Sequence, residues 1–152
     1  MGEPLYFAMG EYRAKIPSDR QYALNHMWAQ ASAGHALRFG FSAYAVRLLQ
    51  DVYFLEWLVP PGTLLAEKQE IGQIESQKAE ASLYTPCAGK MVQFNETLLR
   101  DPSAINVDKY ETGWLFEMAD TLDDLLTPEQ YLQHLTKVWE VTQQTIRGQM
   151  NG

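Results

Sequence analysis

Short runs of strand type, separated by glycines, fill the chain from Thr63 to Asn95, and this pattern limits the fold more than any other. The runs read TLL, IGQIES, ASLYTP and KMVQFN, and the turns or close backbone approaches are marked by Gly62, Gly72 and Gly89. Several short strands at this spacing are typical of a small sandwich or barrel. We therefore expect a mainly β protein.

Helices are predicted outside this region. In FSAYAVRLLQ, Ser42 is placed to cap a short helix, and the DVYFLEWLV run that follows reads as a strand closed by PPG. At the C-terminal end, Thr127 and Gln130 complete a capping box, and Gly148 is the expected stop of the helix. The apolar stripe of this helix consists of Leu132, Leu135, Val138 and Trp139.

Lys78 stands where two of the predicted strands must turn. Its neighbours in SQKAE are polar or small, and apolar alternation resumes only at Leu83. The sequence thus predicts a hairpin with Lys78 exposed at its tip and held by the strands behind it. An exposed lysine is usually only a solvated side chain, whereas a lysine on a rigid hairpin is suited to covalent attachment of a group.

Composition excludes several classes of function. The 152 residues carry a formal net charge of −7 and have a pI near 4.9, which disfavours binding to nucleic acid. Cys87 is the only cysteine, so the chain has no intramolecular disulfide and no cysteine-rich zinc site, and a reducing compartment fits best. No apolar stretch is long enough to span a bilayer, and the N-terminus resembles no signal or transit peptide. We expect no membrane partner and a cytoplasmic location.

The lysine hairpin resembles a known attachment motif. The sequence ESQKA at residues 75–79, followed by YTPCAG at 84–89, is similar to the hairpin of biotinyl/lipoyl carrier domains. Biotin carriers have methionine on both sides of the lysine, whereas Gln77 and Ala79 flank it here, so lipoate is the better match. Three flanking segments resemble the glycine cleavage system H protein family and are absent from ordinary lipoyl domains: IPSDRQYALNHMWA, GFSAYAVRLLQDVYFLEWLVPPGTLL and NETLLRDPSAINVDKYETGWLFEM.

This resemblance implies a fold and a domain organisation. It covers roughly residues 16 to 140. The implied fold is mainly β (α+β), a lipoyl/biotinyl-type barrel-sandwich hybrid of short strands with a short internal helix and a C-terminal helix. Residues 1–15 show mixed charge and no clear period, and they are predicted to be an N-terminal extension, with a loosely packed strand as the alternative. Residues 16–152 are predicted to form a single H-protein-like lipoyl carrier domain.

The resemblance also implies the site and its cofactor. Lipoic acid would be covalently attached to Lys78. The recognition hairpin around the lysine would include Glu75, Ser76 and Ala79, and Gly89 would supply a turn. Alternatively, Glu75 serves only to keep the hairpin soluble. The small Ser76 and Ala79 can likewise reflect the ordinary composition of a turn.

Such a carrier has no reaction of its own. By resemblance, lipoyl-Lys78 would accept an aminomethyl group from a pyridoxal-phosphate (PLP) glycine decarboxylase. A tetrahydrofolate-dependent aminomethyltransferase would then remove the carbon, and a dihydrolipoyl dehydrogenase with FAD would reoxidise the arm. A lipoate ligase or lipoyl transferase would attach the arm in the first place. We expect a monomer, since the carrier must visit several enzymes.

Three departures from the family pattern keep other functions open. Met27 stands where glutamate is common, Gln50 replaces a usual glycine, and Cys87 occupies a normally aliphatic or small position. One alternative is an H-like protein that serves another lipoate pathway, either a lipoyl relay or sulfur metabolism. The other alternative is an unmodified interaction module that keeps only the fold.

The sequence gives little support to other groups of reactive residues. Cys87 could be paired with His26, His35 or His134 as nucleophile and base, but nothing in the spacing favours this. We expect Cys87 to be a buried or turn residue, with a mixed disulfide to the lipoyl arm as the sharper alternative. Three dispersed histidines make no metal site, so no catalytic or metal-binding residues are predicted.

Overall fold

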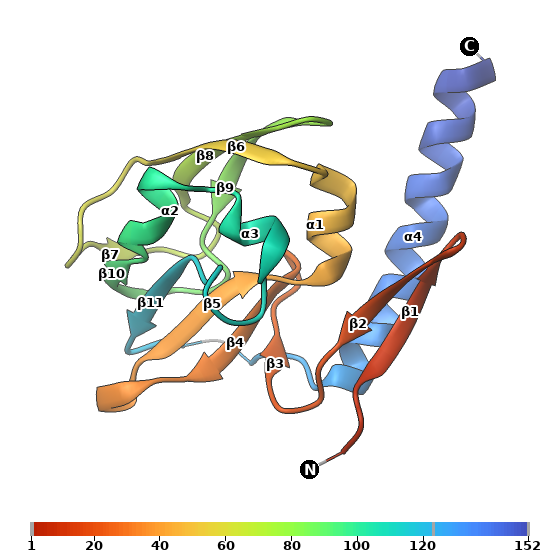
Figure 1. The fold of residues 1–152 in the computed structure, drawn as a ribbon. Coiled ribbons are helices and arrows are strands. Elements are labelled where there is room, and N and C mark those ends of the chain that lie inside the picture. Colours follow the sequence, from red (N-terminus) through yellow and green to blue (C-terminus); the bar gives the residue numbers. More distant parts are fainter. Residues whose placement is uncertain (1, 123, 152) are drawn as a thin grey trace.

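The computed structural model describes residues 2–122 and 124–151, with side chains through residue 143. The strands form three antiparallel sheets (Figure 1). The largest sheet has six strands in the order Gln21–Tyr22 (β3), Met27–Ala31 (β4), Leu37–Phe41 (β5), Phe116–Ala119 (β11), Gly89–Phe94 (β10) and Leu64–Leu65 (β7). A three-stranded sheet has the order Val52–Trp57 (β6), Glu70–Ser76 (β8) and Glu80–Tyr84 (β9), and a two-stranded sheet pairs Leu5–Met9 (β1) with Tyr12–Ile16 (β2).

The two larger sheets enclose the main hydrophobic core. Apolar side chains from both sheets meet in one cluster, which also includes the buried Met27 and Cys87. Each of the four runs predicted between Thr63 and Asn95 contributes one strand, from β7 to β10. The mainly β architecture predicted from the sequence is therefore confirmed.

Helices connect the sheets and close one side of the molecule. Ser42 caps the first helix as expected, because its Oγ accepts a hydrogen bond from the backbone N of Ala45 at 3.3 Å. The capping box is also present, with Thr127 N donating to Gln130 Oε1 at 2.9 Å and Gln130 N donating to Thr127 Oγ1 at 3.1 Å. The helices are Ala43–Leu49 (α1), Glu96–Arg100 (α2), Ala104–Val107 (α3) and Pro128–Asn151 (α4), with a 3-10 turn at Ala33–His35.

The expected stop of α4 at Gly148 is wrong, because the helix continues to Asn151. A glycine inside a helix costs only about 1 kcal/mol relative to alanine, which does not by itself end a helix. Among the described residues no helix is long and apolar enough to cross a lipid bilayer.

The N-terminal hairpin and α4 form a second layer beside the two larger sheets (Figure 1). The buried side chains of this layer pack together with Ala43 and Tyr44 of α1 in a second core. Its other buried members are Phe7, Met9, Ala14, Ile16, Tyr22, Trp28, Tyr131 and Leu135. The segment predicted as an N-terminal extension, residues 1–15, thus holds all of the β1–β2 pair except Ile16, and the inner face of this pair is buried.

Candidate functional site

The hairpin of β8 and β9 presents Lys78 at its tip, as the sequence predicts. Glu75 and Glu80 form the last cross-strand pair of the two strands, and the three residues after Ser76 turn the chain. The side chain of Lys78 is exposed. Its amine is therefore open to any enzyme that approaches the end of this sheet.

Ser76 closes the turn through both backbone polar groups of Ala79. The backbone N of Ser76 donates to the Ala79 carbonyl at 2.8 Å, and Ala79 N donates to Ser76 Oγ at 3.1 Å. Ser76 is buried, with 4% of its surface exposed. Sequence reasoning credited this serine only with being small, whereas the structure gives it the hydrogen bonds that fix the shape of the turn.

Two further hydrogen bonds anchor the tip to a different part of the chain. Gln77 N donates to the Asp51 carbonyl at 2.8 Å, and Lys78 N donates to the Leu49 carbonyl at 3.3 Å. Leu49 is the last residue of α1 and Asp51 directly precedes β6, so the hairpin reaches over the point where α1 passes into β6 (Figure 1). The base of Lys78 is thus held by backbone bonds, while its side chain extends away from them.

Gln50, between these two acceptors, has an uncommon backbone conformation. Its φ of 60° and ψ of −146° lie in a region that suits glycine, so a residue with a side chain is strained there. Asn106 holds the strained joint from both sides: its Nδ2 donates to the Gln50 carbonyl at 2.6 Å, and its Oδ1 accepts from Val52 N at 2.9 Å. The family departure at Gln50 therefore lies directly under the lysine turn.

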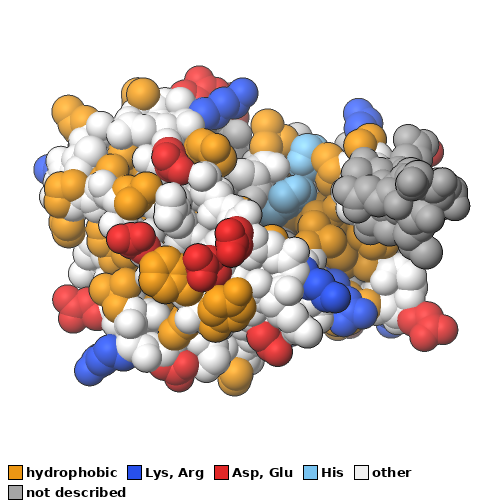
Figure 2. Space-filling view, turned by 90° about the horizontal axis from the view of Figure 1, so that it is seen from above, with side chains coloured by type: hydrophobic (Ala, Val, Ile, Leu, Met, Phe, Trp, Pro, Cys, Tyr) orange, Lys and Arg blue, Asp and Glu red, His pale blue; other side chains and the backbone are white. Residues whose placement is uncertain are grey.

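The surface around the tip is acidic and partly aromatic. Glu75 and Glu80 lie directly opposite each other, an arrangement of like charges that disfavours strand pairing. On the neighbouring strand β6, Tyr53 is 60% exposed and Phe54 41% exposed. Figure 2 looks down on this side of the molecule and shows acidic side chains standing among hydrophobic ones. Such a surface suits a partner whose own surface combines basic and apolar groups.

Gly89 opens β10 immediately after the bend at residues 86–88. A Cβ at this position would come within 3.0 Å of the Ala119 carbonyl oxygen and 3.2 Å of Met118 Cε. The position therefore needs glycine for the close approach of β10 to the end of β11. Two residues earlier, Cys87 is 1% exposed, which confirms the expectation that it is a buried or turn residue.

The histidines are divided between two places. His35 is exposed in the 3-10 turn, whereas His26 and His134 stack with ring centroids 5.6 Å apart. His26 Nδ1 lies 3.0 Å from the Tyr131 hydroxyl, and burial, followed by the charge of His134, lowers the pKa of His26 to about 4. In the described part of the chain, no group of three or more His, Cys, Asp or Glu side chains is arranged to hold a metal ion.

Comparison with known proteins identifies the family. The model of the glycine cleavage H-protein family matches residues 20–144. The chain belongs to this family. The H protein of Thermobifida fusca is 38% identical over 122 residues, covering 78% of this chain and 94% of that protein. The mitochondrial H protein of Drosophila melanogaster is 34% identical over 125 residues, covering 80% of this chain and 75% of that protein.

A solved structure agrees. The crystal structure of a glycine cleavage system H protein from Mycobacterium marinum superposes with a TM-score of 0.68 at 29% identity, covering 80% of this chain and 98% of that one. Membership of the family makes the chain a non-catalytic lipoyl carrier of the glycine cleavage type, and it confirms the expected fold and the resemblance. The family also implies contacts with enzymes of the glycine cleavage system. The hairpin of β1 and β2 precedes residue 20, where the family match begins.

Proposed function

We propose that this chain carries lipoic acid as an amide on Lys78 and shuttles an aminomethyl group between enzymes of glycine cleavage. The observation that carries the proposal is the contrast at the tip: the backbone N of Lys78 and that of Gln77 are bonded to the carbonyls of Leu49 and Asp51, while the lysine side chain is exposed. A long arm attached there has a fixed base and a wide reach. Such a tether raises the concentration of the arm at each partner's site.

The residues around Lys78 fit this group. The lysine amine supplies the nitrogen of the amide, and amidation removes its positive charge. Ser76 and the half-buried Ala79 keep the turn narrow, so no bulky side chain crowds the amine. Once attached, lipoic acid supplies a disulfide that accepts the aminomethyl group and a dithiol that can be reoxidised.

Glu75, Ser76, Ala79 and Gly89 are proposed as the recognition residues of the attaching enzyme, a lipoate ligase or lipoyl transferase. Ser76 and Ala79 act by fixing the turn, and Glu75 by offering a carboxylate three residues before the lysine. Gly89 acts indirectly, because it allows β10 to reach the end of β11 without a clash. These roles are supported by position, hydrogen bonds and packing around the turn.

The remaining partners follow from the names of the relatives and the proposed cycle. They are a PLP-dependent glycine decarboxylase, a tetrahydrofolate-dependent aminomethyltransferase and a dihydrolipoyl dehydrogenase with FAD. The acidic and aromatic surface around the tip supports docking to enzymes with basic and apolar entrances. The monomeric state and the cytoplasmic location stay predictions from the sequence.

In vitro lipoylation followed by glycine cleavage tests the proposal. The purified chain is incubated with a lipoate ligase and lipoate, and the Lys78→Arg variant is compared with Lys68→Arg, which alters another exposed lysine. We expect the wild type and Lys68→Arg to gain one lipoyl group and to support exchange of labelled carbon dioxide into glycine with a decarboxylase. Lys78→Arg should do neither.

The two steps separate the alternatives. Lipoylation of Lys78→Arg at the wild-type rate would overturn the assignment of the attachment residue. Complete lipoylation of the wild type without carbon dioxide exchange would instead favour the other lipoate pathway, which the buried Met27 also keeps open at a position where the family commonly has glutamate.

A further inference from the structure

The N-terminal hairpin, formed by β1 and β2, contacts α1, and the last residue of α1 is hydrogen-bonded to the turn at Lys78. Its strands β1 and β2 pair in register from Leu5 opposite Ile16 to Met9 opposite Tyr12. Phe7 on its inner face meets the Tyr44 ring of α1 edge-on, with ring centroids 6.0 Å apart. The hairpin lies before residue 20 and therefore adds to the family fold a layer that rests on α1.

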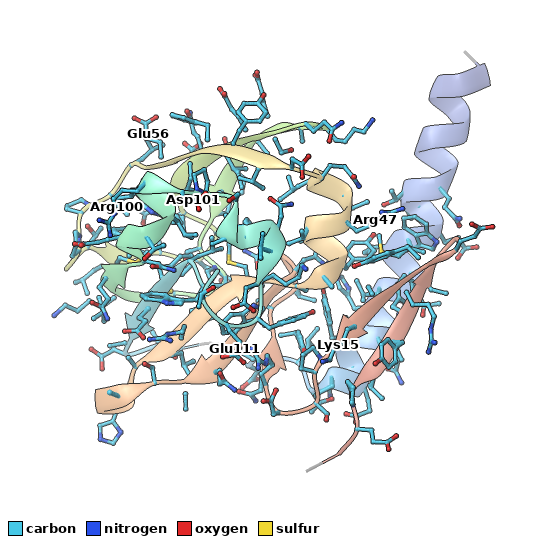
Figure 3. All side chains as sticks on the ribbon, in the orientation of Figure 1. Lys15, Arg47, Glu56, Arg100, Asp101 and Glu111 are labelled. Carbon is cyan, nitrogen blue, oxygen red and sulfur yellow. The ribbon has the colours of Figure 1, made fainter. Side chains whose placement is uncertain are left out.

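Two polar contacts join β2 to α1. The guanidinium of Arg47 on α1 lies over the Tyr12 ring, 4.5 Å from its centroid. Figure 3 shows Arg47 between α1 and the N-terminal hairpin. The Tyr110 hydroxyl accepts from the backbone N of Ala43 at 2.8 Å and donates to the Lys15 carbonyl at 2.5 Å. The hairpin is thus joined to α1 near both ends of the helix, through Tyr110 at Ala43 and directly at Arg47.

The C-terminal end of α1 holds the tip of the β8–β9 hairpin, which carries Lys78. The Leu49 carbonyl, at the last residue of α1, accepts from Lys78 N, and Asp51 accepts from Gln77 N. Between them Gln50 adopts its glycine-like conformation. A strained residue of this kind persists only where the surrounding structure fixes it from several directions. The position of α1 is one of these constraints, so whatever fixes α1 also fixes the turn at Lys78.

We propose that the N-terminal hairpin is a brace that positions Lys78 through α1. Tyr12, Arg47 and Tyr110 are its positioning residues; none of them touches a substrate. A lysine held in one orientation meets the attaching enzyme, and later each partner, in a single approach geometry, which favours reaction. What Lys78 carries rests on the proposed function, whereas the brace itself is a property of the contacts between β2, α1 and the turn.

Backbone hydrogen exchange at the tip tests the brace in the full chain. Arg47→Ala removes the cation above Tyr12, and Arg13→Ala is the matched control, because Arg13 stacks on Tyr6 at the same 4.5 Å on the outer face of the same hairpin. A single cation–π contact is expected to change local opening roughly two- to fivefold. We expect Arg47→Ala to speed exchange of the Gln77 and Lys78 amides by this factor and Arg13→Ala to leave it unchanged, at similar melting temperatures.

Tyr110→Phe provides a second, independent test, because it keeps the ring and removes both hydrogen bonds of the hydroxyl. It should also speed exchange at Gln77 and Lys78, and both brace variants should lower kcat/KM for lipoylation of the chain by a ligase relative to Arg13→Ala. Unchanged exchange at these two amides in both variants would overturn the brace. Absence of lipoylation in the wild type would count against the proposed function alone, since the exchange result does not depend on it.

Discussion

The two hairpins of this protein are built alike and used in opposite ways. The β8–β9 hairpin exposes its tip and is held there by backbone hydrogen bonds to Leu49, at the end of α1, and to Asp51. The β1–β2 hairpin buries alternate side chains against α1 and α4 and turns its charged residues outward. The difference teaches that a hairpin presents a residue when its tip is anchored by backbone, and supports a neighbour when its face is anchored by side chains.

Removing the presented residue should have the largest functional effect and almost no structural one. In Lys78→Ala we expect carrier activity to vanish, whereas the free energy of unfolding should change by less than about 0.5 kcal/mol, because the side chain is exposed. Carbon dioxide exchange and urea unfolding measure the two quantities. Retained exchange activity would contradict the role given to this hairpin.

A substitution in the N-terminal hairpin should instead have a large structural effect, because it removes a buried side chain that anchors the hairpin. Phe7→Ala should cost about 3 kcal/mol of stability, because Phe7 is buried and packs edge-on against both Tyr44 and Trp139. Urea unfolding gives the value, and Tyr6→Ala on the outer face is the control, with an expected cost below about 1 kcal/mol. Equal costs at the two positions would show that the hairpin is not packed as described.

Acid should weaken the layer that contains α4 before it affects the lysine hairpin. Burial lowers the pKa of His26 to about 4, so below its ordinary value of 6.5 the unfolded chain takes up a proton that the folded chain does not. Stability therefore falls as the pH drops through this window, by about 2 kcal/mol between pH 7 and pH 5.

The matched variant for this pH effect is His26→Asn. His26 has a φ of 72°, which asparagine tolerates better than most residues, and asparagine does not titrate. Urea unfolding at several pH values should show a flatter profile for the variant between pH 5 and pH 7. An identical slope in the two proteins would remove His26 from the explanation.

The smallest effect is expected at the joint between α1 and β6. Gln50→Gly relieves the strain of a positive φ but adds freedom to the unfolded chain and loses the side-chain bond to the Arg47 carbonyl. We expect a net gain in the free energy of unfolding of about 1 kcal/mol, measured by urea unfolding. When Arg47→Ala is added to Gln50→Gly, it should no longer speed amide exchange at residues 77–78. A loss of stability would show that Gln50 is not strained there.

Local patterns predicted the elements whose signals lie within a few residues. The helix caps at Ser42 and Thr127, the strands between Thr63 and Asn95 and the exposed position of Lys78 follow from such signals. The N-terminal hairpin also had one: an apolar run, LYFAM, before Gly10 and an apolar alternation, YRAKI, after it, with a φ of 66° at Gly10 that suits a tight turn. Mixed charge in this segment obscured the alternation.

The features that the sequence did not predict depend on contacts between distant segments. The strands β3 to β5 carry no strong alternation, because β4 and β5 each bury several consecutive residues in the large sheet. Likewise, no sequence pattern indicates that the carbonyls on either side of Gln50 accept hydrogen bonds from the backbone N of residues 77 and 78. The identity of the attachment lysine was thus accessible from sequence, whereas the way in which it is held was not.

The measurement that tests the central claim most directly is intact mass with peptide mapping on protein purified from its own host grown with lipoate. The account predicts a mass gain of one lipoyl group, localised to the peptide that contains Lys78. A chain that carries no adduct on Lys78 under these conditions would contradict the assignment and favour an interaction module that keeps only the fold.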